Sequence, residues 1–224
     1  AREDVVVHCP ISGQLERTMV DRLEMDATAI KNLKLTGAIG KEDYTFMREK
    51  MTSLMRLNLK EVESMIDGVY KIPEYAFREK KSLIKCVLPD KLESIEYYAF
   101  YDTSLAGTLQ LPEGLKYVSG FGLTNITNVQ FPSTLEEIGE QAFYGCAYLM
   151  SEISFPTSLK KIGKNAFWGS SIMGNLSLPE AIEEIGENAF AHCAFLTGSL
   201  VIPNSIKEIC SYSFSYCGFT GNLT

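Results

Sequence analysis

Apolar residues recur at a nearly constant interval along the second part of the chain. Phe occupies the clearest of these positions, and Leu123 is the residue predicted to fill its one gap. The column is Phe77, Phe100, Leu123, Phe143, Phe167, Phe190 and Phe214, with steps of 23, 23, 20, 24, 23 and 24 residues. A period of this length is typical of a solenoid, in which each repeat is one coil stacked on the next.

Two further apolar patterns keep the same interval within each coil. A pair spaced by three precedes each Phe, as at Leu159 and Ile162, and a pair spaced by two precedes a proline, as at Leu176 and Leu178 before Pro179. Apolar residues at every second position predict a short strand with one face buried. The proline ends that strand, and the Leu-x-x-Ile segment is predicted to form the opposite wall of the coil.

These patterns predict an α/β fold: a right-handed solenoid of about six or seven coils over residues 66–224, with a parallel β-sheet along one wall. The coil at residues 113–132 is shorter and lacks the Ala-Phe pair. It is predicted to pinch the solenoid. The sequence leaves open whether this bends the stack or makes a notch beside Phe121 and Tyr144.

Residues 1–65 lack the repeat and are predicted to form an α/β cap that is continuous with the solenoid. Segment 13–25 predicts a helix with one apolar face, formed by Leu15, Met19, Val20 and Leu23. Segments 30–37 and 54–59 alternate like strands, and 41–51 predicts a second helix. Such a cap would cover the open apolar end of the first coil, which a solenoid requires.

One column of charged residues also follows the repeat. The first residue after the Leu of Leu-x-x-Ile alternates in sign along Glu93, Lys116, Glu136, Lys160, Glu183 and Lys207. Because neighbouring strands lie about 4.8 Å apart, each charge is expected to meet an opposite charge on both sides. Exposed pairs of this kind contribute only about 0.2 to 1 kcal/mol each, so we expect the column to favour correct register rather than to supply much stability.

Composition narrows the class of partner. The chain is 46% hydrophobic and 22% charged with a net charge of -7, and it has no Lys/Arg run, which argues against a nucleic-acid partner. No apolar run approaches the roughly 18 residues of a membrane span. The chain starts at Ala1 and stops at Thr224 partway through a repeat. We therefore expect a piece of a longer protein, whose export signal or lipid anchor would lie upstream.

The sequence carries no motif for catalysis, a metal or a cofactor. The two histidines, His8 and His192, each adjoin a cysteine, but adjacent side chains rarely point the same way and no third ligand is placed beside them. Three further positions favour a structural role for sulfur: Cys146, Cys193 and Cys217 each follow a Phe of the repeat by three residues. This register predicts a ladder of buried thiols, with disulfides as the alternative.

The repeat resembles a known family. The units "LPEAIEEIGENAFAHCAFL" (178–196) and "FPTSLKKIGKNAFWGSS" (155–171) are similar to the leucine-rich repeats of the BspA-like, Treponema-type class, and the resemblance covers about residues 66–224. It implies a non-enzymatic protein of a bacterial cell surface, or a secreted one, that adheres to host proteins such as those of the extracellular matrix or to other bacteria.

Two outward columns are candidates for binding. The first follows the strand before each proline and is mostly small and uncharged: Val87, Gln110, Gln130, Ser154, Ser177 and Val201. The second is the large aromatic residue directly after a Phe of the repeat: Tyr101, Tyr144 and Trp168. A further aromatic column directly precedes the Ala position and contains Tyr75, Tyr98, Phe121 and Tyr212. Exposed aromatic rows suit a protein partner or the face of a sugar.

The sequence therefore predicts a binding or adhesion module for a protein ligand, such as an extracellular-matrix or other surface protein. One alternative is a carbohydrate-binding accessory module that uses Tyr101, Tyr144 and Trp168 to bind a glycan. Another is a passive spacer that presents a further domain. The sequence leaves the ligand and the oligomeric state open.

Overall fold

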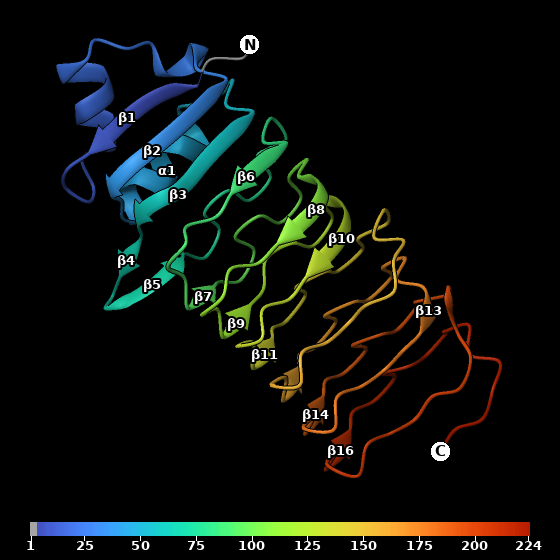
Figure 1. Ribbon diagram of the computed structural model, residues 1–224. Coiled ribbons are helices and arrows are strands. Elements are labelled where there is room, and N and C mark those ends of the chain that lie inside the picture. The colour runs from blue at the N-terminus through green and yellow to red at the C-terminus, as the bar shows by residue number, and fades with distance from the viewer. Residues whose placement is uncertain (1–3) are drawn as a thin grey trace.

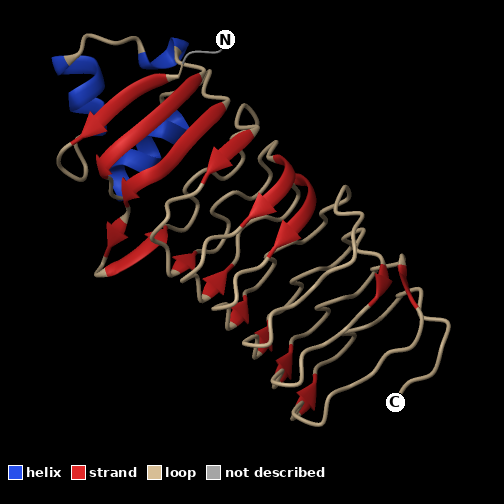
Figure 2. Cartoon of the chain, viewed as in Figure 1, coloured by secondary structure: helices blue, strands red, loops and turns tan. Residues whose placement is uncertain are grey.

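The computed structural model describes residues 4–224 as an elongated stack of coils (Figure 1). The N-terminal cap lies at one end of the stack, and the chain proceeds coil by coil to the C-terminus at the other end. The described helices all lie in the cap, and the strands of the coils are short and lie along the walls (Figure 2). The predicted solenoid with parallel strands is confirmed.

The cap is built on three parallel strands, β1 (Val5–Cys9), β2 (Asn32–Ala38) and β3 (Arg56–Glu63). The sequence patterns indicated β2 and β3 but missed β1. The sheet, in the order β1-β2-β3-β6, continues from the cap into the repeats, because β3 pairs in parallel with β6 (Lys85–Val87) of the first coil. The cap and the coils thus share one hydrogen-bonded sheet, and a boundary at residue 65 stays a prediction.

The helices of the cap cover one face of this sheet. They are a π-helix, η1 (Arg17–Arg22), a 3-10 turn, η2 (Ala27–Ala29), and the predicted second helix, α1 (Lys41–Glu49). The buried Asp43 of α1 accepts backbone hydrogen bonds from Gly13 (2.6 Å), Leu15 (2.8 Å) and Gly40 (2.8 Å). This one carboxylate therefore starts the helix and also fixes the N-terminal segment against it.

The apolar face predicted for the first helix is half wrong. Leu15 and Met19 are buried, whereas Val20 and Leu23 are exposed. The turn is wider than an α-helix, as the hydrogen bond from the Leu23 N–H to the Thr18 carbonyl (3.1 Å) spans five residues. A face counted at the α-helical period therefore no longer points inward by Leu23.

The continuous sheet of the solenoid lies on the Leu-x-x-Ile wall, not on the wall before the prolines, and the predicted assignment of the two walls is corrected accordingly. Its eight strands run in the order β16-β14-β12-β11-β9-β7-β5-β4. They are β4 (Met65–Ile66), β5 (Val69–Ile72), β7 (Ser94–Ile95), β9 (Tyr117–Val118), β11 (Glu137–Ile138), β12 (Lys161–Ile162), β14 (Glu184–Ile185) and β16 (Glu208–Ile209). The seven strands from β5 to β16 pair in parallel, and β4 pairs with β5 as an antiparallel hairpin.

The wall before the prolines is paired only in pieces. It contains the pairs β8 (Ala106–Gln110) with β10 (Asn125–Gln130) and β13 (Gly174–Asn175) with β15 (Leu196–Thr197), and two isolated bridges. The reason is chain length: each proline precedes the Ile or Val of the long sheet by six residues in every repeat, whereas the distance from Phe to proline varies from 11 to 13. Strands keep a common register only where the connecting length is constant.

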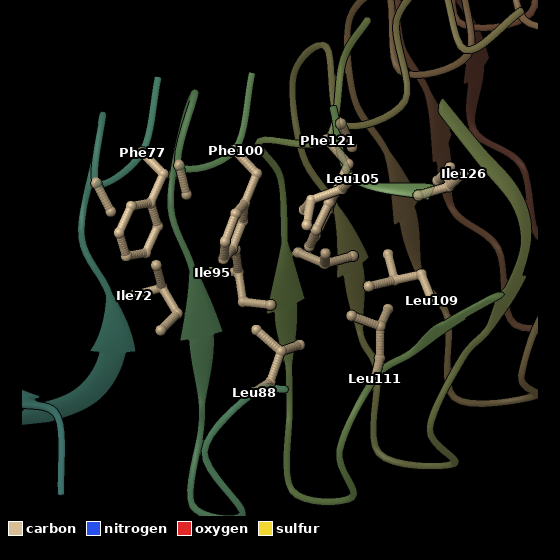
Figure 3. Close-up of a cluster of buried hydrophobic side chains, with 14 of the residues drawn as sticks. Ile72, Phe77, Leu88, Ile95, Phe100, Leu105, Leu109, Leu111, Phe121 and Ile126 are labelled. Atoms are coloured by element: carbon tan, nitrogen blue, oxygen red, sulfur yellow. The ribbon is translucent and has the colours of Figure 1, made fainter. Parts of the chain in front are cut away.

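The interior of the coils is a column of stacked Phe rings (Figure 3). Centroids of successive rings from Phe77 through Phe100, Phe121 and Phe143 to Phe167 are 5.5, 5.0, 6.0 and 5.3 Å apart. Each ring fills its coil beside an Ile or Val of the long sheet, as Phe100 does beside Ile95 in Figure 3.

Phe121, not Leu123, therefore fills the gap in the Phe column, and the prediction for Leu123 is wrong. Phe121 is fully buried, whereas Leu123 is 38% exposed on the turn with φ +56°. The short coil has lost two residues between Val118 and Phe121, where other coils have five steps from Ile to Phe. The prediction assumed an even spacing of 23 residues across this deletion and so chose Leu123. The same assumption wrongly placed Phe121 in the outer aromatic column.

The position three residues after each Phe is a small polar slot. It holds Thr103, Thr124, Cys146, Ser170, Cys193 and Cys217. The thiols of Cys146 and Cys193 donate to the carbonyls of Phe121 (3.2 Å) and Phe167 (3.0 Å) in the preceding coils. All six cysteines are free. The predicted thiol ladder is interrupted by Ser170 between Cys146 and Cys193, and Cys217 is only partly buried.

The same slot holds Lys80 in the first coil, where the cap meets the repeats. Lys80 is 6% exposed, and its ammonium donates to the carbonyls of Arg48 (3.1 Å) and Met51 (2.8 Å) at the C-terminal end of α1. Helix C-termini leave such carbonyls without intrahelical donors. One buried lysine thus joins the helix of the cap to the first coil.

The residues of the predicted charge column lie next to one another in neighbouring coils and are joined by backbone hydrogen bonds. The Lys160 N–H donates to the Glu136 carbonyl (2.8 Å), and the Glu183 N–H donates to the Lys160 carbonyl (2.8 Å). Side-chain contact within this column is seen between Lys207 and Glu183 at 2.6 Å. The neighbouring column adds Lys161, whose ammonium lies 3.3 Å from Glu184 and 3.9 Å from Glu137.

Candidate binding surfaces

Each coil turns at its Ala-Phe pair, and the turn is held by a backbone ladder. The N–H of Phe143 donates to the Ala166 carbonyl of the next coil (2.7 Å), and the Phe167 N–H donates to the Ala189 carbonyl (2.7 Å). The residue before the Ala and the residue two after the Phe have positive φ, as at Asn188 (56°) and His192 (61°). Asn tolerates this left-handed conformation better than most residues.

This geometry stacks the side chains that leave the turn. The rings of Tyr144 and Trp168 lie 4.8 Å apart at 9°, Trp168 and His192 lie 5.1 Å apart at 56°, and His192 and Tyr216 lie 4.6 Å apart at 15°. We call these four residues the aromatic ladder. Two of the three residues predicted for the row, Tyr144 and Trp168, are therefore brought together.

The third predicted residue, Tyr101, belongs to a separate cluster. Its ring lies 4.1 Å from that of Tyr98, and Tyr98 lies 4.0 Å from Tyr97. Tyr101 lies over Gly122 of the short coil, where an added Cβ would come within 2.9 Å of the Tyr101 ring. The Tyr98 hydroxyl donates to the Gln141 side-chain oxygen (2.7 Å). These tyrosines cover the short coil, where an open notch was one of the two predicted outcomes.

The ladder residues His192 and Tyr216 were not identified as members of the row from the sequence. The predicted row used only the residue directly after each Phe, whereas His192 and Tyr216 stand two residues after Phe190 and Phe214. His192 lies exposed on the turn. The full ladder could be found in the sequence only by examining both outward positions of the turn, one and two residues after each Phe of the repeat.

A group of large apolar side chains is exposed close by in sequence. The exposed residues are Tyr148 (58%), Met150 (58%), Met173 (38%) and Phe195 (52%). They leave adjacent coils, because the Met173 N–H donates to the Ser151 carbonyl (3.1 Å) and the Gly174 N–H donates to the Phe195 carbonyl (3.2 Å). We call these four residues and the aromatic ladder the aromatic–methionine surface. No predicted column included its apolar members, although Tyr148 and Phe195 stand at the same position of the repeat, five residues after Phe143 and Phe190.

Neighbouring rings of the ladder cover one another's faces to different degrees. Tyr144 and Trp168 lie nearly parallel at 4.8 Å, as do His192 and Tyr216 at 4.6 Å, whereas Trp168 and His192 are tilted by 56°. A sugar stacks on an open, electron-rich aromatic face. The faces that Tyr144 and Trp168 turn toward each other are therefore not open to a sugar.

The uncharged column before the prolines is exposed as predicted, except for the partly buried Val87. Gln110 and Gln130 are opposite each other in β8 and β10, and Ser154 and Ser177 form a parallel bridge. These side chains can accept and donate hydrogen bonds, but none supplies the large buried contact area of an aromatic or arginine anchor.

The chemistry of the described residues offers no metal centre. Among residues 4–224 no group of three His, Cys, Asp or Glu side chains is placed to hold a metal ion. Burial raises the pKa values of the Cys146 and Cys193 thiols to about 12, so both are protonated at neutral pH and are poor nucleophiles. Within the same residues, none of the helices has the length and apolar character needed to cross a membrane.

Comparison with solved structures places the fold among bacterial leucine-rich repeat proteins. A leucine-rich repeat protein from Bacteroides ovatus is similar with a TM-score of 0.63 at 18% identity, over 98% of this chain and 60% of the other. The chain thus spans about three fifths of the length of that protein. A T. pallidum leucine rich repeat protein is similar at 14% identity over 98% of this chain and 73% of the other, with a TM-score of 0.37.

A leucine rich cell surface protein from Faecalibacterium prausnitzii is similar at 19% identity over 86% of this chain and 78% of the other, with a TM-score of 0.39. No curated protein matches the sequence. The sequence model of the BspA type leucine rich repeat region matches residues 50–121 and 119–222, in six copies. The registered Phe, Ile and Pro columns and this match over most of the chain show that the protein belongs to the BspA type leucine rich repeat family.

Proposed function

We propose that this chain is a non-enzymatic module that binds another protein through the aromatic–methionine surface. The observation that carries the proposal is the cluster of exposed apolar side chains on adjacent coils, with Tyr148, Met150 and Phe195 each more than half exposed. Soluble proteins seldom expose such clusters without a partner. Aromatic residues and Met are also enriched at the centres of protein interfaces.

The rigidity of the surface supports the same proposal. Tyr144 and Trp168 are stacked side by side and their backbones are tied to the next coils by the Gly145–Trp168 and Gly169–Ala191 hydrogen bonds (2.7 and 2.8 Å). Side chains that are already ordered lose little conformational entropy when a partner binds. The aromatic ladder would thus serve as a preorganised anchor, and the flexible Met150 and Met173 would adapt to the partner.

A protein partner fits this surface better than a glycan does. Apart from Tyr216 at the end of the ladder, which is 77% exposed, the rings are stacked face to face or tilted against one another. Edges of aromatic rings and thioether chains pack well against apolar protein side chains. The column of Gln110, Gln130, Ser154 and Ser177 lies further along each coil and is not part of the proposed interface.

The proposal also includes the cellular location of the protein. Membership of the BspA type family and the resemblance described above support display on a bacterial surface or secretion, with proteins of the host matrix or of other bacteria as the class of partner. Partner identity is open, so the test must screen rather than assume one ligand.

The experiment is a binding screen of the purified chain against a panel of extracellular-matrix proteins, bacterial surface proteins and glycans. We expect at least one protein to bind, and Trp168→Ala to weaken that binding by about tenfold or more, as expected for an anchor residue. Leu23→Ala is the control, since Leu23 is an apolar side chain that is exposed but lies in the cap.

Three outcomes would contradict the proposal. Binding to glycans alone, with loss in Trp168→Ala, would establish the carbohydrate alternative. A protein partner that binds both variants equally would move the site away from the aromatic–methionine surface. If a folded sample binds no member of the panel, the result would favour the spacer alternative.

A further inference from the structure

A cavity lies away from the aromatic–methionine surface, where the cap meets the first coil. It has a volume of about 760 Å³. Helix α1 lines one side with Lys41, Thr45 and Arg48, and residues 73–79 of the first coil line the other. A volume of this size is in the range of ligand-binding sites in proteins.

The backbone ladder of the turns ends at this groove. In the first coil the N–H groups of Tyr75, Phe77 and Glu79 donate to carbonyls of the second coil, at 3.1, 2.7 and 2.8 Å. Every later coil repeats this direction, so carbonyls always point toward the N-terminal side. The carbonyls of Glu74, Ala76 and Arg78 therefore face the groove, and no group in residues 4–224 donates to them.

Helix α1 occupies the place of a preceding coil but does not complete the ladder. Beyond its first turn, its N–H groups are used within the helix. A helix also packs with its axis about 8 to 10 Å from its neighbour, whereas ladder strands lie about 4.8 Å apart. The Arg48 side chain reaches only the Tyr75 carbonyl, at 2.6 Å. Three acceptors at alternate residues are left open along one edge.

The side chains of the groove carry both signs of charge, with the basic residues Lys41, Arg48, Lys71 and Arg78 beside the carboxylates of Glu74, Glu79 and Glu96. Each of its four basic side chains already contacts a carboxylate; the pairs are Lys41–Asp67 (2.8 Å), Lys71–Asp67 (3.9 Å), Arg48–Glu49 (3.0 Å) and Arg78–Glu79 (3.0 Å). Glu74 and Glu96, which also line the groove, have no ion-pair partner in the described part of the chain, although Glu96 accepts a hydrogen bond from the Ser94 hydroxyl (2.7 Å). The groove therefore offers a peptide three open backbone carbonyls and two carboxylates without a cationic partner.

We propose that this groove binds a short basic peptide segment, laid along residues 74–78 as one more turn of the ladder. N–H groups at alternate peptide residues would donate to the carbonyls of Glu74, Ala76 and Arg78. A lysine or arginine side chain of the peptide would pair with Glu74 and Glu96. The mode is that of strand addition, in which backbone hydrogen bonds give affinity and side-chain contacts give the preference.

The experiment titrates the isotope-labelled chain with a capped six-residue peptide of alternating lysine and threonine, followed by amide shifts in NMR spectra. We expect saturable shifts at residues 71–79. The glutamate–threonine counterpart should bind more weakly. Glu74→Gln combined with Glu96→Gln should weaken the lysine peptide by about fivefold, whereas Glu180→Gln, an exposed glutamate elsewhere, should leave binding unchanged.

Two N-methylated forms of the lysine peptide test the backbone part of the proposal. Methylating the residues of one alternate set should abolish binding, and methylating the other set should preserve it, because only one set faces the open carbonyls. Equal binding of both forms would overturn the ladder addition. So would equal affinity for the glutamate peptide, or the absence of saturable shifts up to about 5 mM peptide. None of these outcomes depends on the aromatic–methionine surface.

Discussion

At the scale of single residues, the fold depends on a few positions whose surroundings allow only one or a few types of side chain. The Phe position is the clearest, since its ring stacks on rings 5.0 to 6.0 Å away on both sides from Phe100 through Phe167. The slot three residues later accepts Thr, Ser or Cys, because each can donate to a Phe carbonyl, as Thr124 does to Phe121 (2.7 Å). Lys80 is the exception, and it serves the junction with α1.

The corrected register of the short coil leads to the first prediction. Phe121→Ala should lower the free energy of unfolding by about 3 to 5 kcal/mol, because it removes a buried ring from the column. Leu123→Ala should cost less than about 0.5 kcal/mol, because Leu123 is exposed. Urea unfolding of both variants measures the difference, and a larger loss for Leu123→Ala would restore the evenly spaced column.

A second prediction concerns Lys80. Lys80→Ala should destabilise the chain by about 1 to 3 kcal/mol, because it leaves the Arg48 carbonyl without its donor and the Met51 carbonyl with only the Leu54 N–H (3.1 Å). Lys85→Ala, an exposed lysine in β6, is the matched control and should change stability little. Equal unfolding midpoints for the two variants would show that the junction does not depend on Lys80.

The pH dependence of the Lys80 contribution follows from its burial. Desolvation lowers the pKa of the Lys80 ammonium, so the unfolded chain binds its proton more tightly than the folded chain does. Stability from this group is therefore lowest below the folded pKa and rises as pH increases toward the ordinary lysine pKa. Relative to Lys80→Met, the wild type should gain stability over that range, and a constant difference would contradict the burial argument.

At the scale of elements, constant chain length decides which segments form a sheet. The Pro-to-Ile segment has the same length in each repeat, and its strands form the continuous wall, whereas the variable Phe-to-Pro segment pairs in pieces. Within the continuous wall, Lys161 pairs with the acidic residues Glu137 and Glu184 on its two sides. The last pair breaks this alternation of charge, because Glu184 pairs with Glu208. Two like charges thus meet at the end of the sheet.

Glu208→Lys should relieve this repulsion and raise the free energy of unfolding by about 0.5 kcal/mol at low salt, since a cross-strand pair contributes about 0.2 to 1 kcal/mol. The gain should shrink as salt screens the pair. Chemical denaturation with urea at two ionic strengths measures both effects. Glu208→Gln should give a smaller gain, and a gain independent of salt would mean that charge is not its cause.

The repeat columns allowed the solenoid and its period to be predicted from the residues alone, because each column records the same contact in every coil. They did not show which wall carries the continuous sheet, and that assignment was wrong. The other errors lie where the repeat is broken. Leu123 and Phe121 were interchanged because a deletion between Val118 and Phe121 shifted the count. The exposed Tyr148 and Phe195 share one position of the repeat, five residues after Phe143 and Phe190, but the coil between them has the buried Ile172 there, so no unbroken aromatic column marks the position.

At the scale of the whole molecule, each coil of the stack contacts mainly its two neighbours, and the cap covers the first. The last coil of this 224-residue chain has a neighbour on one side, and its wall residue Ile209 is 47% exposed, whereas Ile185 in the preceding coil is fully buried. Stability in such a stack is close to a sum of coil and interface terms. It should therefore decrease toward the C-terminal end of this chain.

Amide hydrogen exchange tests this gradient. We expect the highest protection in the hydrogen-bonded turns around Phe143 and Phe167, and clearly faster exchange in residues 206–224. Uniform protection along the stack would instead indicate that the chain unfolds as one cooperative unit.

The central functional claim is that a protein partner binds the aromatic–methionine surface. The most direct measurement is the affinity of a partner from the screen for the double variant Tyr148→Ser and Phe195→Ser, beside the control double variant Val6→Ser and Leu23→Ser in the cap. The account predicts that the first variant loses about tenfold or more in affinity while the second binds like the wild type. Equal affinity of both variants, each shown to be folded, would contradict it.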